Sequence, residues 1–309
     1  MTRRAATFVL VLTALALASP LLAPYESGRA FRDYLHAPPM RPRLSGLGPP
    51  VVHPLVLADR LAQRYEPDAT RTVPLPWFSR AGDSPVFLLG ADSFGRDVLS
   101  RLLYGARTSI GLALFATLGA VTIGALAGAW AGYRGGWIDE LVMRLADFVL
   151  VLPVIYVVLV LRAVLPLVLP ASTVFLLVSW IFVVVGWPFV AKGVRAIVAA
   201  ERDREYVQAA RSLGAGPGRI LMHHLIPACA GYLVVQATLL LPAFILAEAT
   251  LSFVGLGFPD PVASWGTMLA ETANIGSVAR FPWTLAPALA IFLVVLSTNL
   301  LTAEHNHPK

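Results

Sequence analysis

Two ionisable residues, Arg162 and Glu248, lie within long apolar runs, where charged side chains are uncommon. A charge inside a membrane segment is costly, so a functional role is the default hypothesis for an intramembrane carboxylate such as Glu248. Alternatively, Glu248 is a structural partner of a backbone amide or of Arg162. Arg162 could instead extend its guanidinium to the membrane interface. Both residues are therefore candidates for lining a polar pathway or for a structural role.

Motifs for covalent or nucleotide chemistry are absent from the sequence. There is no Gly-x-Ser-x-Gly, and the adjacent His223 and His224 lie in a polar loop, which argues against an intramembrane hydrolase. There is also no Gly-x-x-x-x-Gly-Lys-Ser/Thr loop for ATP phosphates. A single cysteine, Cys229, allows no intrachain disulfide, and no Cys/His cluster has zinc-site spacing. We expect no enzyme activity, no metal and no cofactor bound by this chain.

The composition predicts an integral membrane protein. Of the 309 residues, 57% are apolar and only 14% are charged, whereas a soluble domain has about 25% charged residues. The mean hydropathy is +0.71. The net charge of +6 comes from scattered arginines without a basic stripe interleaved with aromatics, so nucleic acid is not an expected partner.

Six apolar runs predict an all-α membrane protein with six transmembrane helices. They cover residues 8–23, 109–133, 145–165, 172–190, 232–257 and 282–301. The first run is short, and it could also be a signal peptide with Ala16-Leu17-Ala18 as the cleavage site. With both termini in the cytoplasm, the loop at 192–230 is cytoplasmic and carries six Lys or Arg. The short outside loops at 166–171 and 258–283 carry one, which agrees with the positive-inside rule.

The chain before the second span predicts a separate region. Residues 25–89 are proline-rich and read as an extracytoplasmic insert, with one helical candidate at 54–65. The apolar face of Val98, Leu99, Leu102 and Leu103 predicts an amphipathic helix at the membrane surface. We therefore divide the chain into 1–107, with the first helix, the insert and the amphipathic helix, and 108–302, the transmembrane core.

Glycines recur every four residues in the second span, at Gly124, Gly128 and Gly132. A ridge of small residues lets membrane helices approach closely. The alternative is that glycine is simply common in membrane helices.

The polar loop at 199–227 is predicted to hold two short helices. Tyr206, Ala209, Ala210 and Leu213 follow the spacing i, i+3, i+4, i+7, which gives a narrow apolar stripe. The opposite face carries Arg204, Gln208 and Arg211.

Capping residues set the expected ends of these helices. Asp203 is the predicted N-cap of the first helix and Gly214 its C′ glycine. Pro217 is predicted to open the second helix, and Pro227 to end it.

The run QAARSLGAGPGRILMHHLIP resembles the EAA loop of ABC-importer permeases. In that family Glu-Ala-Ala is followed by three residues, Gly, nine residues and Ile-x-Leu-Pro. Ala209, Ala210, Gly214 and Pro227 match in register, and Gln208 stands where the family has Glu. The resemblance implies a cytoplasmic coupling helix that docks on an ATPase subunit. The residues expected to take part are Tyr206, Gln208, Ala209, Ala210, Leu213, Gly214 and Pro227.

Two further stretches resemble the C-type permease subunits of dipeptide, oligopeptide and nickel importers. They are LLGADSFGRDVLSR, from residue 88, and EATLSFVGLGFPDPVASWGTML, from residue 248. The resemblance implies a multi-pass inner-membrane protein with a retained first helix. It also implies a heterodimer with a second permease subunit, two cytoplasmic ATPase subunits that bind the ATP, and an extracytoplasmic substrate-binding protein.

The cargo and two other classes of function stay open on sequence alone. Peptides are the expected cargo, with nickel or other small solutes as alternatives. A stand-alone secondary transporter or a membrane anchor subunit is the alternative function. Secondary transporters usually contain repeated halves, and this sequence has no internal repeat.

Overall fold

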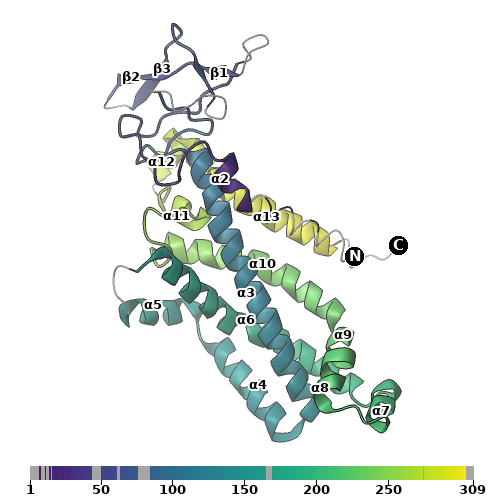
Figure 1. Cartoon of the computed structure of the whole chain (residues 1–309). Coiled ribbons are helices and arrows are strands. Elements are labelled where there is room, and N and C mark those ends of the chain that lie inside the picture. The colour runs from purple at the N-terminus through teal and green to yellow at the C-terminus, as the bar shows by residue number, and fades with distance from the viewer. Residues whose placement is uncertain are drawn as a thin grey trace. The chain divides into compact units, whose positions relative to one another are not determined.

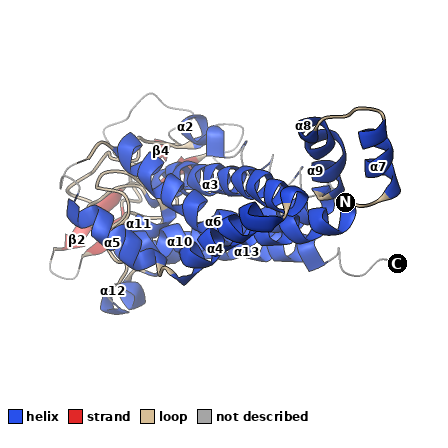
Figure 2. Cartoon of the chain, turned by 90° about the horizontal axis from the view of Figure 1, so that it is seen from below, coloured by secondary structure: helices blue, strands red, loops and turns tan. Residues whose placement is uncertain are grey.

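The computed structural model describes residues 7, 11, 14, 16–43, 50–60, 63–75, 84–164, 169–273 and 275–303. Helix predominates over strand in this part of the chain (Figure 2). The helices are α2 (Ser19–Leu22), α3 (Val98–Arg134), α4 (Gly136–Val151), α5 (Val154–Val164), α6 (Ala171–Glu201), α7 (Glu205–Ser212), α8 (Pro217–Ile220), the π-helix η2 (Leu221–Leu225), α9 (Ile226–Ala228), α10 (Ala230–Phe253), α11 (Trp265–Ala270), α12 (Ile275–Arg280), the 3-10 helix η3 (Pro282–Leu285) and α13 (Ala286–Ala303). The strands are β1 (Val51–Val52), β2 (Leu55–Asp59), β3 (Arg64–Pro67) and β4 (Val73–Pro74).

The described residues group into two compact units. One, here called the helical unit, comprises those within Met1–Phe8, Leu112–Ala247 and Val294–Lys309. The other, the insert unit, comprises those within Val9–Gly111 and Glu248–Leu293. This grouping rests on contacts within the chain. The division into 1–107 and 108–302 rests on composition and stays a prediction.

Four segments of the described chain are long and apolar enough to cross a membrane. They are Val98–Arg134, Ala171–Glu201, Ala230–Phe253 and Pro282–Asn299. The predicted span at 145–165 is divided between α4 and α5, because Leu152 is extended and Pro153 interrupts the helix. In the first predicted span, 8–23, residues 8–10, 12, 13 and 15 lie outside the described residues, and α2 covers Ser19–Leu22.

Two boundaries predicted from sequence were wrong. The amphipathic helix and the second span form one continuous helix, α3, of 37 residues. Asp97 stands just before α3 and accepts a hydrogen bond of 2.8 Å from the Ser100 backbone amide, as an N-cap side chain does. The segment 134–144, which separates the second and third predicted spans, is mostly helix, because only Gly135 separates α3 from α4.

The glycine ridge on α3 packs against α6 within the helical unit, as predicted. A Cβ on each of these glycines would overlap the backbone of α6 in matching register, with Gly124 facing the carbonyl of Trp187, Gly128 that of Ala191 and Gly132 that of Arg195. The glycines on α3 and the carbonyls that they face on α6 both recur every four residues. One face of each helix therefore stays in contact with the other helix over two turns.

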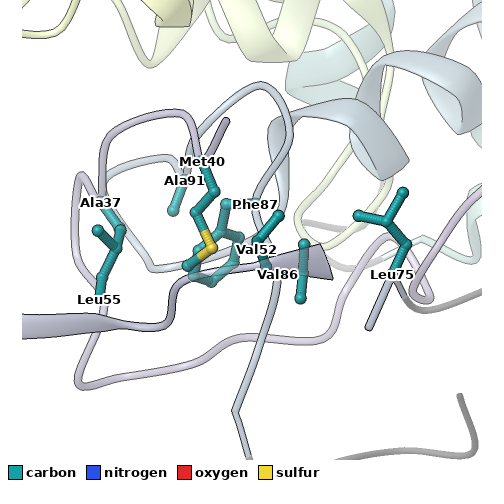
Figure 3. Packing of buried hydrophobic residues seen from close by; sticks show 8 residues of the cluster. All are labelled: Ala37, Met40, Val52, Leu55, Leu75, Val86, Phe87 and Ala91. Carbon is teal, nitrogen blue, oxygen red and sulfur yellow. The ribbon is translucent and has the colours of Figure 1, made fainter. Parts of the chain in front are cut away.

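The insert unit contains a small core built on paired strands. β1 pairs antiparallel with β4, and β2 with β3. Figure 3 shows eight buried side chains of this core, with Met40 and Phe87 near its centre. They are Ala37, Met40, Val52, Leu55, Leu75, Val86, Phe87 and Ala91.

The helix predicted at 54–65 was wrong, since this segment contains β2 and the start of β3. Leu55 is buried while Val56 is 55% exposed, which follows the period of two along a strand. The hydroxyl of Tyr65 on β3 donates a 2.8 Å hydrogen bond to the Leu35 carbonyl and ties the hairpin to the preceding chain. The i, i+4 spacing of Leu57 and Leu61 fitted a helix equally well on sequence alone.

Candidate functional site

The segment that resembles the EAA loop contains α7, which lies beside α8 (Figure 1). α7 ends in a glycine turn. Gly214 has a φ of 82°, and its amide bonds to the Arg211 carbonyl at 2.9 Å, while the Ala215 amide bonds to the Ala210 carbonyl at 3.0 Å. These two bonds define a Schellman motif. The prediction of Gly214 as the C′ residue is confirmed.

The start of α7 differs from the prediction. The N-cap is Arg204, with an extended backbone and no side-chain capping bond, and not Asp203. Instead, the Gln208 side-chain amide donates a 2.9 Å hydrogen bond to the Asp203 carbonyl. A carboxylate cannot donate this bond, so Gln208 here has a role that the family's Glu cannot fill.

Most of the apolar stripe predicted on α7 is exposed, although Ala210 is half-buried. Leu213 is 88% exposed and Tyr206 is 43% exposed, and Ala209 is also exposed. The side chain that α7 buries is Val207, which the stripe did not include. Exposed apolar side chains that lie together on a surface are typical of a site that another molecule covers.

Tyr206 is further held by two neighbours. Its hydroxyl donates a 2.9 Å hydrogen bond to Glu201 Oε2, and its ring lies 6.2 Å from that of His224, centroid to centroid. The contacts link α7 backward to the end of α6 and forward to η2.

Pro217 opens α8 at its first position, as predicted, but Pro227 does not end the helix. The chain continues through η2 and α9 to Ala228. A proline lacks the amide that bonds four residues back, and the wider π turn at Leu221–Leu225 accommodates this loss. Pro227 is exposed within α9.

Two ion pairs join α4 to α6 near the same loop. Asp139 accepts a 2.8 Å bond from Arg195 Nε, and Asp147 pairs with Lys192. The Arg195 guanidinium lowers the pKa of the Asp139 carboxyl. Asp139 therefore stays ionised at neutral pH and holds Arg195 in place.

Glu248 lies in the insert unit and is 1% exposed. It accepts hydrogen bonds from Ser109 Oγ at 2.8 Å and from Ser252 Oγ at 2.7 Å. Ser109 Oγ also accepts the Trp265 backbone amide at 3.1 Å. The carboxylate thus joins residues of α3, α10 and α11 through hydroxyl groups. The Arg162 side chain, its other predicted partner, lies outside the described side chains.

A buried ion cluster in the insert unit was not foreseen from the sequence. Arg96 bonds to Asp92 at 2.7 Å, to Glu271 at 2.8 Å and to Asp260 at 2.7 Å. Arg101 donates a 2.6 Å hydrogen bond to Asp92 and forms an ion pair with Glu271 at 2.8 Å. Both arginine side chains are at most 3% exposed. Burial of their positive charges is costly unless the carboxylates compensate them.

The signature around residue 96 contained a signal for this cluster. Asp92, Arg96 and Arg101 lie within ten residues, and charges so close together next to an apolar run suggest mutual pairing. The bridging carboxylate, Glu271, follows 170 residues later, and no local pattern connects it to the signature.

Comparison with known proteins agrees with the three motifs. Residues 120–304 match the family model described as binding-protein-dependent transport system inner membrane component. The dipeptide transport system permease protein DppC of Alkalihalophilus pseudofirmus is 37% identical over 71% of this chain and 70% of its own length. The di/tripeptide transport system permease protein DppC of Pseudomonas aeruginosa is 34% identical over 95% of this chain and 82% of its own length.

The family model matches more than half of the chain. The two DppC relatives are more than 30% identical to it over more than two thirds of their length, which establishes the family of this chain. The chain is thus a multi-pass membrane permease subunit and not an enzyme. It belongs to the family of inner membrane components of binding-protein-dependent transport systems.

Proposed function

We propose that this permease moves short peptides across the inner membrane and that partner ATPases drive it by docking on α7. The peptide cargo is supported by the relatives, which are named as dipeptide and di/tripeptide permeases. Nickel and other small solutes are the alternatives, because no residue of the described chain selects between them.

The exposed end of α7 is the observation that carries the coupling proposal. Leu213 is 88% exposed, although an apolar side chain of this size gains about 1.5–3 kcal/mol when it is fully buried. The Schellman turn fixes Leu213 and its neighbours in one conformation, so little ordering entropy is lost when a partner covers them. Tyr206, Gln208, Ala209, Ala210 and Gly214 make up the rest of this docking helix and its turn.

The proposal includes a six-span topology with both termini in the cytoplasm. It counts the segment 145–165, which is divided between α4 and α5, as one broken span and the segment 8–23 as another. Under this topology α7 faces the cytoplasm, where ATPase subunits are located. The six Lys and Arg residues of the loop at 192–230 support that side of the membrane.

We also propose the partners that this arrangement requires. Six spans are few for a complete pathway, so a second permease subunit would form the other half as a heterodimer. Two ATPase subunits would bind the ATP, and this chain would hold no cofactor. An extracytoplasmic binding protein, as the family description implies, would deliver the cargo.

Uptake by the reconstituted complex tests this function. Proteoliposomes containing both permeases and the ATPases, with the binding protein outside and ATP inside, would be given radiolabelled dialanine and, separately, nickel ions. We expect dialanine uptake that requires both ATP and the binding protein, and little nickel uptake. Nickel uptake without dialanine uptake would overturn the peptide proposal, and uptake independent of the ATPases would overturn the coupling proposal.

A further inference from the structure

The C-terminal end of α3 is linked to the loop around α7 by two arginines of the helical unit. Arg202 Nη1 donates a 3.1 Å hydrogen bond to the carbonyl oxygen of Gly132. The Arg211 guanidinium lies over the ring of Tyr133, 5.2 Å from its centroid. Gly132 and Tyr133 are in the last turn of α3, which ends at Arg134.

The first link satisfies a group that the helix itself leaves unpaired. Carbonyls in the last turn of a helix have no intrahelical donor, and the helix dipole favours a cation there. Gly132 also packs against the backbone of α6, because a Cβ at this position would overlap the Arg195 carbonyl. The end of α3 is therefore held by α6 and by Arg202, which follows α6 directly.

The second link comes from α7 itself. Arg211 is exposed on α7, two residues before the exposed Leu213, and Tyr133 is half-buried on α3. A cation over an aromatic face needs no fixed hydrogen-bond direction, so the contact tolerates small shifts of one helix along the other. Arg211 reaches α3, while the apolar stripe of the same short helix stays open for a partner.

We propose that Arg211 and Tyr133 are positioning residues that carry a displacement of α7 directly into α3. The inference rests on the proposed docking of ATPase subunits on α7. α7 already connects to α6 through the chain and to Glu201 through Tyr206. The Arg211–Tyr133 contact adds a side-chain route to a second candidate membrane span. Without it, ATPase movement would reach α3 less completely, and ATP would be hydrolysed with less transport.

Four single variants and one double variant test the contact. Arg211→Gln and Tyr133→Leu remove it, while Arg211→Lys and Tyr133→Phe preserve a cation and a ring. The full complex would be reconstituted with each variant, and radiolabelled dialanine uptake and ATP hydrolysis would be measured in the same vesicles. ATPase co-purification and the melting temperature of each variant would be recorded in parallel.

We expect Arg211→Gln and Tyr133→Leu each to lower the number of dipeptides moved per ATP by about two- to fivefold, which corresponds to an exposed cation–π contact. The double variant should match the single ones, because both remove the same contact. Arg211→Lys and Tyr133→Phe should keep most of the wild-type ratio. Complex assembly and melting temperature should not change, since a purely structural role would alter these quantities first.

Two results would overturn this inference. One is a wild-type transport ratio in both Arg211→Gln and Tyr133→Leu. The other is loss of ATPase binding in Tyr133→Leu, which would make the contact part of docking instead of transmission. Failure of the docking proposal would be detected by a different result, because ATPase subunits would then co-purify unchanged with a Leu213→Asp variant.

Discussion

Ser109 Oγ donates a 2.8 Å hydrogen bond to Glu248 Oε2, a residue 139 positions later in the chain. The same hydroxyl accepts the Trp265 amide, and Ser252 donates to the other carboxylate oxygen. The buried carboxylate is therefore the common acceptor that holds α3, α10 and the start of α11 together within the insert unit.

We predict that Glu248→Ala lowers stability by about 2–5 kcal/mol, because it opens a cavity and leaves two buried hydroxyls without their acceptor. Glu248→Gln should cost less, since an amide can bond to both serines. Melting temperatures of the purified permease in one detergent would measure this order. Equal melting temperatures for wild type and Glu248→Ala would show that the hydrogen bonds contribute nothing to stability.

The buried carboxyl of Asp97 makes the stability of the folded protein depend on pH. Burial raises the pKa of its carboxyl to about 6, above the usual 3.8. The folded protein then holds this proton more tightly than the unfolded chain, so Asp97 contributes less stability as pH rises from about 4 to about 6. The whole effect is at most about 3 kcal/mol.

We predict that Asp97→Asn removes this loss and still accepts the Ser100 amide bond as an N-cap. Melting temperatures of wild type and variant would be compared between pH 4.5 and 7.5. The melting temperature of the variant should increase relative to that of the wild type as pH rises. Parallel curves across this range would refute a titration of Asp97 in it.

Gly128→Ala should destabilise the packing of α3 on α6 by about 1–3 kcal/mol, because its Cβ would overlap the Ala191 carbonyl. Gly231→Ala is the matched control. Gly231 also lies in a helix, but a Cβ there meets nothing within 4 Å. The control should be neutral or stabilising by at most about 1 kcal/mol. Similar melting temperatures for the two variants would contradict the close packing.

Gln208→Glu should loosen the start of α7, because a carboxylate cannot donate to the Asp203 carbonyl. A lost hydrogen bond of about 0.5–1.5 kcal/mol predicts amide exchange about two- to tenfold faster in the first turn of α7. Hydrogen exchange with mass spectrometry would measure this, with Ala215 and its neighbours as the internal reference. Unchanged amide exchange in the first turn of α7 would mean that the Gln208 hydrogen bond does not hold the start of this helix.

Local patterns predicted the parts of the fold that depend on local chemistry. Gly214 was predictable because a left-handed turn after a short helix requires a residue without a Cβ. The glycine ridge of α3 was predictable because its spacing places three small residues on one helix face. The family was predictable from three motifs in order.

Predictions failed where distant residues decide the structure. Leucines at positions 57 and 61 are compatible with a helix or a strand. The segment Leu55–Asp59 forms a strand because it pairs with β3. The apolar stripe of α7 was placed correctly on the helix, but only the fold shows that it is exposed and that Val207 is buried. The ion cluster needs Glu271, which no local pattern connects to Arg96 and Arg101.

The measurement that tests the account most directly is co-purification of the cognate ATPase subunits with this permease in detergent. Wild type would be compared with Leu213→Asp and Ala209→Arg, which place charge on the exposed stripe of α7. Val56→Asp, an exposed apolar residue on β2, is the matched control. We predict that wild type and Val56→Asp retain the ATPase while both α7 variants lose it. Retention of the ATPase by all four proteins would contradict the role of α7.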